Sequence, residues 1–409
     1  MKKHFPLTST RLLAATTAFA AAALVAACGG GGGSSTGSGT PPVDPAGAPV
    51  TIFDRTTAPS KLSAWHFVLS DGAKLTLNDG VVPYDLNTAL FSDYAFKLRA
   101  LYVPAGKQIG YKADGTLDFP VGSAIMKTFY YPTATGTDAA YTGVARANQT
   151  AQGSSIDLAT HRLIETRVLV RQPDGTWTGL PYVWDADQKD ATLKIGGASV
   201  ALELVGGGGA NEKFAYGVPN AQTCEKCHST ETSGGKGILP IGPKARNMNK
   251  SYAYDAATTK NQLVALDDLK LLSGFTGIAT APVNADWRDT TQTLEARAKA
   301  YLDSNCAHCH NPGGNASQSG LMLDYATVGT TTTPSKWGVC KKPLAYGGPG
   351  APYRYGIEPG QADVSLLLYR MSHTATADVM PAVGRHVNHT EANAMIGDWI
   401  NSLTLAACL

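Results

Sequence analysis

Apolar and polar positions alternate in several short runs between residues 51 and 210, with the period of a β-strand that buries one face. In the clearest run, 164–171, apolar and threonine side chains occupy the even positions and mainly charged ones the odd positions. Turn sequences lie beside such runs: Pro173-Asp174-Gly175, Gly196-Gly197 and Asp114-Gly115. We therefore expect a β-rich, sandwich-like or barrel-like domain over residues 51–210, with hairpins at these turns.

The pattern changes after the glycine run 206–209, where loops with scattered helical periodicity replace the alternation. Asn261 is a candidate N-cap for one helix, and a second helix is expected over 293–305. Thr390 is a candidate N-cap for a third, whose apolar face holds Met395, Ile396, Trp399, Ile400 and Leu403. We expect two mainly helical modules, over residues 211–288 and 289–409.

Residues 1–27 have the pattern of an export signal. Lys2, Lys3 and Arg11 accompany an uncharged apolar run, 12–27, that is slightly short for a membrane span. The run ends in Val25-Ala26-Ala27-Cys28, which resembles a bacterial lipobox and implies cleavage before Cys28 and lipidation of that residue. An ordinary secretory signal or an uncleaved anchor is the alternative. Gly29 offers no inner-membrane retention signal of the Asp type, so we expect a lipid-anchored outer-membrane protein that faces the periplasm or the surface.

Residues 28–50 are rich in Gly, Ser, Thr, Pro and Ala, and such a segment has too little apolar surface to fold. As a random coil it would reach about 25 Å and serve as a tether. The 409-residue chain has 34 basic and 32 acidic residues, and loss of the signal's three cations would leave 31 basic ones. This balance gives no reason to expect nucleic acid as a partner.

The sequence Cys-x-x-Cys-His occurs twice, as Cys224-Glu225-Lys226-Cys227-His228 and as Cys306-Ala307-His308-Cys309-His310. On a helical turn, positions i, i+3 and i+4 share a face. Two thiols there can form thioethers with the two vinyl groups of one haem, and the adjacent histidine can ligate its iron. The two motifs therefore predict two covalently bound haem c groups, with His228 and His310 as proximal ligands.

A zinc site and a redox disulfide are the alternatives for these cysteines. Zinc ribbons place two Cys-x-x-Cys units some 15–20 residues apart, far closer than the two motifs here. A redox disulfide requires no histidine next to the second cysteine. Of the seven cysteines, Cys28, Cys340 and Cys408 lie outside the motifs, and an oxidising compartment favours a Cys340–Cys408 disulfide, the alternative being two separate thiols.

The sixth iron ligands are less constrained by the sequence. Met380, followed by Pro381, lies between the second motif and the last helix, which is the order found in small class I cytochromes c. Its rivals are Met371, His373, His386 and His389. For the first haem, Met248 is the one methionine between His228 and the second motif, and it can equally be a core residue. The nearby cations Lys244, Arg246 and Lys250 are candidates for haem propionates, or for solvated surface charges.

The chain resembles a family of bacterial di-haem c-type cytochromes with a β-rich N-terminal half. The resemblance covers nearly all of the chain after the tether and is carried by five stretches: 83–94, 127–132, 165–184, 241–246 and 305–314. It implies export and electron transfer, often beside a partner β-helix repeat protein. The expected fold class is thus multidomain, with a β-rich domain followed by two mainly α, cytochrome c-like haem modules.

Three functions remain open from the sequence. The first is an electron carrier between redox partners in the cell envelope, with both axial positions of each iron filled. The second is a di-haem peroxidase- or oxidase-type enzyme with one open iron. The third is a surface binding protein that acts through its β-rich domain. A firm sixth ligand for the first haem would separate the first two, and the sequence offers none.

Overall fold

The computed structural model describes residues 47–149, 153–232, 235–325, 334–344, 353–374 and 377–404. The expected signal, Cys28 and its tether to residue 46, and Cys408, lie outside these ranges. Within them, no helix is both long and apolar enough to cross a membrane.

The N-terminal half is β-rich, as the alternation predicts. Its largest sheet has six antiparallel strands in the order β11-β10-β9-β6-β4-β3. The strands are β3 (Val81–Tyr84), β4 (Phe96–Tyr102), β6 (Ala124–Pro132), β9 (His161–Arg171), β10 (Trp177–Trp184) and β11 (Ala191–Leu193). The run 164–171 lies in β9, and the turn at 173–175 connects β9 to β10, so both predictions are confirmed.

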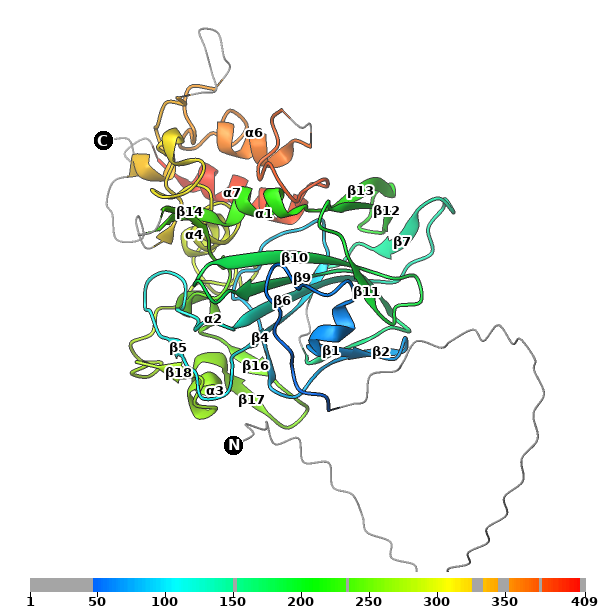
Figure 1. Cartoon of the computed structure of the whole chain (residues 1–409). Coiled ribbons are helices and arrows are strands. Elements are labelled where there is room, and N and C mark those ends of the chain that lie inside the picture. The colour runs from blue at the N-terminus through cyan, green and yellow to red at the C-terminus, as the bar shows by residue number, and fades with distance from the viewer. Residues whose placement is uncertain are drawn as a thin grey trace, which may run out of the picture.

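Two smaller sheets flank the large one (Figure 1). One contains β1 (Val68–Ser70), β2 (Lys74–Leu77) and β8 (Ser155–Asp157) and follows the short 3-10 helix η1 (Leu62–Trp65). The other contains β7 (Thr142–Ala145), β12 (Ala198–Val205) and β13 (Glu212–Val218), so the strands continue past residue 210. Gly196-Gly197 does not form the expected hairpin, because β11 pairs with β10 whereas β12 pairs with β13 and β7. The chain passes there from one sheet to another.

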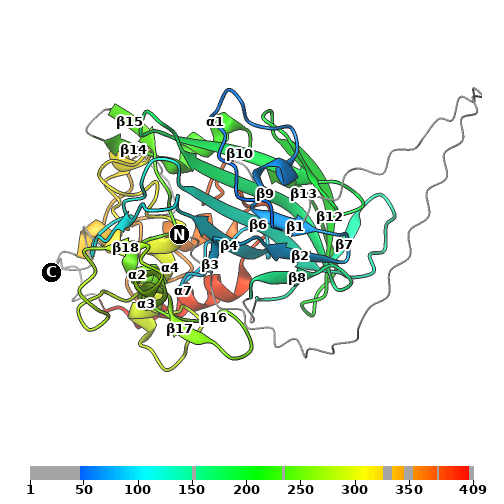
Figure 2. The same ribbon diagram turned by 60° about the horizontal axis from the view of Figure 1, so that its bottom comes forward.

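The two faces of the large sheet bury different cores. On one face, Trp65 and Leu75 pack with Met126 and Val168, and the indole of Trp65 donates a hydrogen bond of 2.8 Å to the Tyr182 hydroxyl. On the other face, near the β3–β4 edge, side chains of the sheet pack against short elements of the next segment. These are α2 (Ala245–Met248), β16 (Ser251–Ala253), β17 (Thr259–Asn261) and α3 (Gln262–Asp268), which lie together in both ribbon views (Figures 1 and 2).

The expectation of a mainly helical module over 211–288 was wrong, because the described part of this range holds six strands beside three short helices. Short strand pairs connect this segment to itself and to the β-rich half. β14 (Ser229–Thr232) pairs with β15 (Gly235–Ile238), and β18 (Leu272–Ser273) pairs in parallel with β5 (Ile109–Gly110). The side chain of Asn261 accepts a hydrogen bond from the backbone N–H of Leu263, which confirms it as the N-cap of α3.

The C-terminal segment is mainly helical. Its elements are α4 (Leu294–Asn305), the 3-10 helices η2 (Ser317–Ser319) and η3 (Pro334–Trp337), α6 (Leu366–Ser372) and α7 (Thr390–Ser402). α4 begins after the N-cap Thr293, at the expected position. Thr390 is the first residue of α7 and not its cap, because His389 occupies the N-cap position without a side-chain hydrogen bond. The apolar faces of α4 and α7 meet in one core, with Leu302, Ile396 and Trp399 buried between them.

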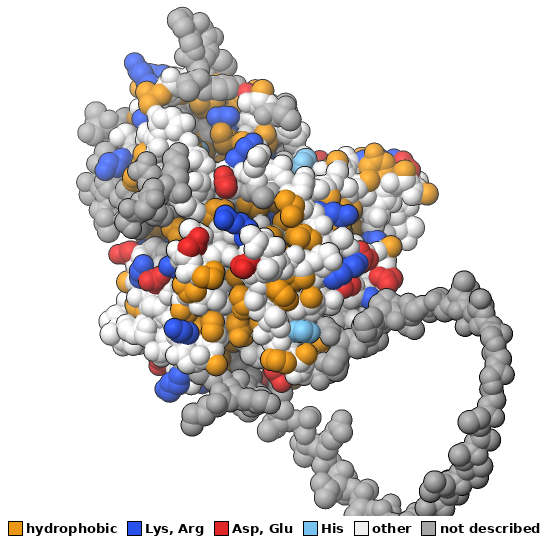
Figure 3. Space-filling view, in the orientation of Figure 1, with side chains coloured by type: hydrophobic (Ala, Val, Ile, Leu, Met, Phe, Trp, Pro, Cys, Tyr) orange, Lys and Arg blue, Asp and Glu red, His pale blue; other side chains and the backbone are white. Residues whose placement is uncertain are grey.

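The first Cys-x-x-Cys-His motif lies on α1 (Ala221–His228), between β10 of the large sheet and the helical segment (Figure 1). On the face shown in Figure 3, basic and acidic side chains are interspersed, in keeping with the formal net charge of +2.

Candidate functional site

The two Cys-x-x-Cys-His motifs converge in the folded chain. The sulfur atoms of Cys227 and Cys309 and a ring nitrogen of His308 all lie within 4.8 Å of one another. Asn315 fastens the two motifs together, because its side-chain amide donates to the backbone carbonyls of Glu225 at 3.3 Å and Lys226 at 2.8 Å. Segments some 80 residues apart in the sequence therefore form one site.

Local structure gives each motif its shape. The Asn220 side chain accepts from the Thr223 N–H and starts α1, which carries Cys224, Cys227 and His228 on its last turns. The second motif begins where α4 ends: the backbone N–H groups of Cys309 and His310 both donate to the carbonyl of Cys306. In the second motif the turn brings Cys306, Cys309 and His310 to one cavity, whereas in the first motif Cys227 lines that same cavity and Cys224 and His228 line a smaller one.

Both motif histidines are held through Nδ1. His228 Nδ1 lies 2.7 Å from the carbonyl oxygen of Leu239, and His310 Nδ1 lies 3.2 Å from the Ser319 hydroxyl, which itself donates to Ala316. Burial lowers the pKa of His228 to about 3 and that of His310 to about 4, so both rings are neutral at neutral pH. A neutral ring that donates through Nδ1 leaves Nε2 as the acceptor that a metal ion requires.

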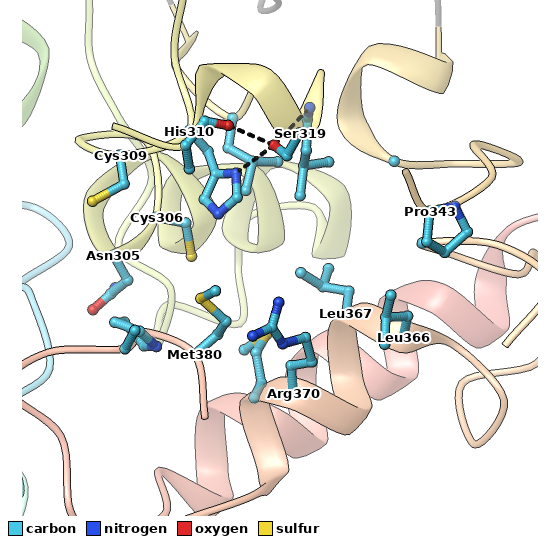
Figure 4. Close-up of a pocket in the computed structure, with 18 of the residues that line it drawn as sticks. Asn305, Cys306, Cys309, His310, Ser319, Pro343, Leu366, Leu367, Arg370 and Met380 are labelled. Carbon is cyan, nitrogen blue, oxygen red and sulfur yellow. Dashed lines mark hydrogen bonds between the residues drawn. The ribbon is translucent and has the colours of Figure 1, made fainter. Parts of the chain in front are cut away.

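A cavity of about 620 Å³ lies beside the second motif. Cys306 and His310 line one side of it, and Met380 approaches from the loop after α6 on the other (Figure 4). The backbone of that loop is held by a 3.0 Å hydrogen bond from the Met380 N–H to the Arg370 carbonyl. The structure therefore brings His310 and Met380 to one largely apolar cavity, as expected for two ligands of one iron.

The rivals of Met380 are placed differently. Met371 lines the same cavity, whereas the three histidines do not belong to its described lining. His373 contacts the Tyr369 carbonyl at 2.7 Å, and His386 pairs with Asp93 at 3.0 Å. His389 stacks on Phe91 with the ring centroids 4.0 Å apart. Each histidine thus has a structural contact away from the cavity.

A smaller cavity of about 70 Å³ lies beside the first motif. Cys224 and His228 line one side, and the large sheet lines the other with Arg99, Lys127 and Arg167. The sheet passes close to α1: a Cβ atom added to Gly179 of β10 would lie 3.5 Å from the sulfur of Cys224. Burial, with Arg167 and Arg99 nearby, lowers the pKa of Lys127 to about 7.

Met248 does not line this cavity. Its side chain is fully buried in the core between the sheet and α3. Among the described lining residues, the side chains other than His228 that offer a nitrogen or oxygen atom are Tyr84, Arg99, Lys127 and Arg167. The structure thus places Met248 as the core residue that was its alternative role in the sequence.

The expected propionate cations near the first motif already have counter-charges. Lys244 lies 3.6 Å from Asp303, Arg246 3.5 Å from Asp114, and Lys250 2.9 Å from Asp85. The cations that line the cavity instead come from three strands of the sheet, and sequence reasoning missed them. The sequence signal for Arg167 was its place among the charged positions of the run 164–171. From one strand alone, such positions are predicted to face solvent.

The seven cysteines are the four of the two motifs and three others. The four motif cysteines are not in disulfides. Cys340 is disulfide-bonded, while its expected partner Cys408 and the expected lipidation site Cys28 lie outside the described residues. Among the described residues, one group of at least three His, Cys, Asp or Glu side chains lies close enough together to bind a metal ion directly. It consists of Cys227, His308 and Cys309.

Comparisons of the chain with protein-family models, with curated proteins and with solved structures found no match.

Proposed function

We propose that this protein is an exported electron carrier with two covalently attached haem c groups, one at each Cys-x-x-Cys-His motif. The observation that supports this most is the convergence of the motifs, with the sulfur atoms of Cys227 and Cys309 within 4.8 Å. Each of these sulfurs would belong to a different haem attachment. Adjacent attachment points favour a single electron relay through the chain over two independent sites.

A bound haem supplies an iron that takes up and releases one electron. The chain's own residues do the rest: the thiols fix one edge of the group, and His228 and His310 present Nε2 because Nδ1 is hydrogen-bonded. Met380 offers a thioether from the opposite side of the second cavity. A thioether ligand stabilises ferrous iron, so the second site should have the higher reduction potential.

A di-haem peroxidase- or oxidase-type enzyme is the second candidate. The observation that favours it is the first cavity, where the described lining offers neither a methionine nor a second histidine opposite His228. An iron with an open sixth position there would bind a small substrate such as a peroxide.

The proposed setting is the cell envelope, where Cys28 would carry a lipid anchor and residues 29–50 would hold the folded part off the membrane. The proposed partners are redox proteins, and the family resemblance suggests a β-helix repeat protein among them. More than one acyl chain is required for stable anchoring, and a bacterial lipobox supplies such modification.

Mass spectrometry of the protein purified from a host that matures c-type cytochromes tests these proposals together. We expect two haems per chain and acyl groups on Cys28. Cys224→Ser/Cys227→Ser and Cys306→Ser/Cys309→Ser are matched variants, each of which should retain one haem. A chain without covalent haem would refute the carrier, and an unmodified Cys28 would refute the anchor. High-spin ferric iron in the electron paramagnetic resonance spectrum, with rapid peroxide turnover, would refute the electron carrier and support the peroxidase-type enzyme.

A further inference from the structure

Three basic side chains form a row across the large sheet. In the strand register, Arg99 of β4 pairs with Lys127 of β6, and Lys127 pairs with Arg167 of β9. Since paired residues point to the same face of a sheet, all three side chains project to one side. That side faces α1, and all three line the cavity that Cys224 and His228 also line. We call these three residues the basic row.

The basic row is only partly neutralised by the described residues around it. Arg99 is 3% exposed, and Nη1 lies 2.8 Å from Asp85, whereas Nη2 is buried without a hydrogen-bond partner among the described residues. Arg167 Nε donates to Glu165 at 2.9 Å. The described contact of the Lys127 ammonium is with the face of the Phe129 ring, at 5.1 Å from its centroid.

The formal charges at the basic row do not balance. Five further charged groups contact or flank it: Lys97, Lys250, Asp85, Glu165 and Asp93, the last of which acts on Lys97. Five formally positive groups against three carboxylates leave an excess of two formal positive charges, and burial together with this excess lowers the pKa of Lys97 and of Lys127. Like charges close together at a partly buried site are unfavourable unless counter-ions or loss of a proton relieve them, so an anion bound there would stabilise the charged form of the cluster.

We propose that the basic row binds the two propionate carboxylates of the haem attached at Cys224 and Cys227. This inference rests on the proposed function. Two propionates carry two negative charges and accept hydrogen bonds from the fork of an arginine and the point charge of a lysine. They would satisfy Nη2 of Arg99 and the ammonium of Lys127, which the described protein groups leave without hydrogen-bond acceptors.

The direction of the basic row supports propionates over a free small anion. Cys224 lies against Gly179 of β10, at one end of the strand order β10-β9-β6-β4. A haem carries its propionates on the edge opposite the one that bears the thioethers. The basic row leads from Arg167, beside the attachment point, to Arg99, about 10 Å further across the sheet at two strand spacings. The cations therefore extend across the sheet away from Cys224, as the propionate edge of a haem attached there would.

The test uses the full-length holoprotein with Lys127→Met, which removes the charge but retains a side chain of similar length. Lys107, on an exposed loop, gives the matched control Lys107→Met. Removal of a positive charge near the iron favours the ferric form, so the lower of the two midpoint potentials should fall. The propionate bending band in the resonance Raman spectrum should also shift. The other potential and the low-spin spectrum should stay unchanged, and Lys127→Arg and Lys107→Met should behave like the original protein.

Unchanged potentials and an unchanged propionate band in Lys127→Met would overturn the inference. Conversion of one haem to high spin would also overturn it, because Lys127 would then be the sixth ligand. If Lys127→Met fails to fold, the original protein provides the test: transfer to D₂O should shift the propionate band of the first haem, and no shift would reject the assignment. Haem counting by mass separates these outcomes from failure of the proposed function, since a chain without haem at Cys224 refutes both.

Discussion

In the proposed di-haem carrier, single side chains decide which atoms can reach each iron. Met380 and Met371 both line the larger cavity, although they differ in their backbone setting. Met371 lies on α6 and packs in the core between α4 and α7, whereas Met380 lies on the loop that returns across the cavity. The loop methionine lies across from His310 without having to leave a helix core (Figure 4).

In the proposed di-haem carrier, Met380→Ala should lower the potential of one haem and abolish its Met-to-ferric charge-transfer absorption, with both haems still attached. The physical reason is loss of the thioether that stabilises ferrous iron. Met371→Leu, a substitution of similar volume in the same cavity, is the control and should leave the absorption intact. Redox titration with near-infrared absorption measures both effects, and survival of the band in Met380→Ala would exclude this residue as the ligand.

Residue patterns in the sequence predicted the parts of the site that depend on near neighbours in the chain. The spacing Cys-x-x-Cys-His defines a local turn, and the hydrogen bonds at Nδ1 of His228 and His310 agree with the role expected of them. The basic row could not be predicted from the sequence, because Arg99, Lys127 and Arg167 become neighbours only through strand pairing. Likewise, the approach of Cys227 to Cys309 depends on how α1 and α4 meet, which no local spacing encodes.

Helices and strands could be predicted where the residues of one strand or one turn determine them. The strand alternation in 164–171 and the caps Asn261 and Thr293 lie where expected, since each depends on neighbours within a few residues. The hairpin at Gly196-Gly197 was wrong because partner choice between strands depends on the whole sheet arrangement. This turn instead fits against the segment between β13 and α1.

Gly197→Ala should destabilise the protein by about 1–3 kcal/mol, a range typical of backbone strain at a packed turn. Gly197 has a φ of +77°, and a Cβ there would lie 2.7 Å from the carbonyl oxygen of Val218 and 3.0 Å from the backbone nitrogen of Asn220. Asn220 is the N-cap of α1, so the first motif would be disturbed as well. Gly196→Ala is the matched control, since a Cβ there meets nothing within 4 Å. Equal midpoints of the two variants in chemical denaturation would contradict this account.

At the scale of the whole molecule, Asp93 joins the β-rich half to the helical segment. Its buried carboxylate accepts from the backbone N–H groups of His386 at 2.6 Å and Val387 at 2.9 Å, and pairs with the His386 ring at 3.0 Å. The His386 ring also lies against Phe214 of β13. Residues nearly 300 positions apart are thus held together by one side chain, a long-range contact that no sequence pattern indicated.

Asp93→Ala should therefore lower the free energy of unfolding by about 2–4 kcal/mol, because it leaves two backbone N–H groups without acceptors where they are desolvated. The charge on His386 adds a pH-dependent part. The hydrogen bond with Asp93 raises the pKa of His386 above its ordinary value, so the bond stabilises the folded state fully below about pH 6.5, the unfolded pKa. This stabilisation is lost as the pH rises through the higher folded pKa.

The pH-dependent part should be less than about 1 kcal/mol, because a partly exposed pair is screened by solvent. The His386 side chain is 41% exposed. Unfolding free energies of the original protein and His386→Gln, compared from pH 5.5 to pH 8.5, isolate this contribution. The original protein should lose its advantage over His386→Gln as the pH rises, while Asp93→Ala should remain destabilised throughout, since its lost backbone hydrogen bonds do not titrate. A difference between the original protein and His386→Gln that grows with pH would contradict the raised pKa, and a fully stable Asp93→Ala would show that the two halves are held together elsewhere.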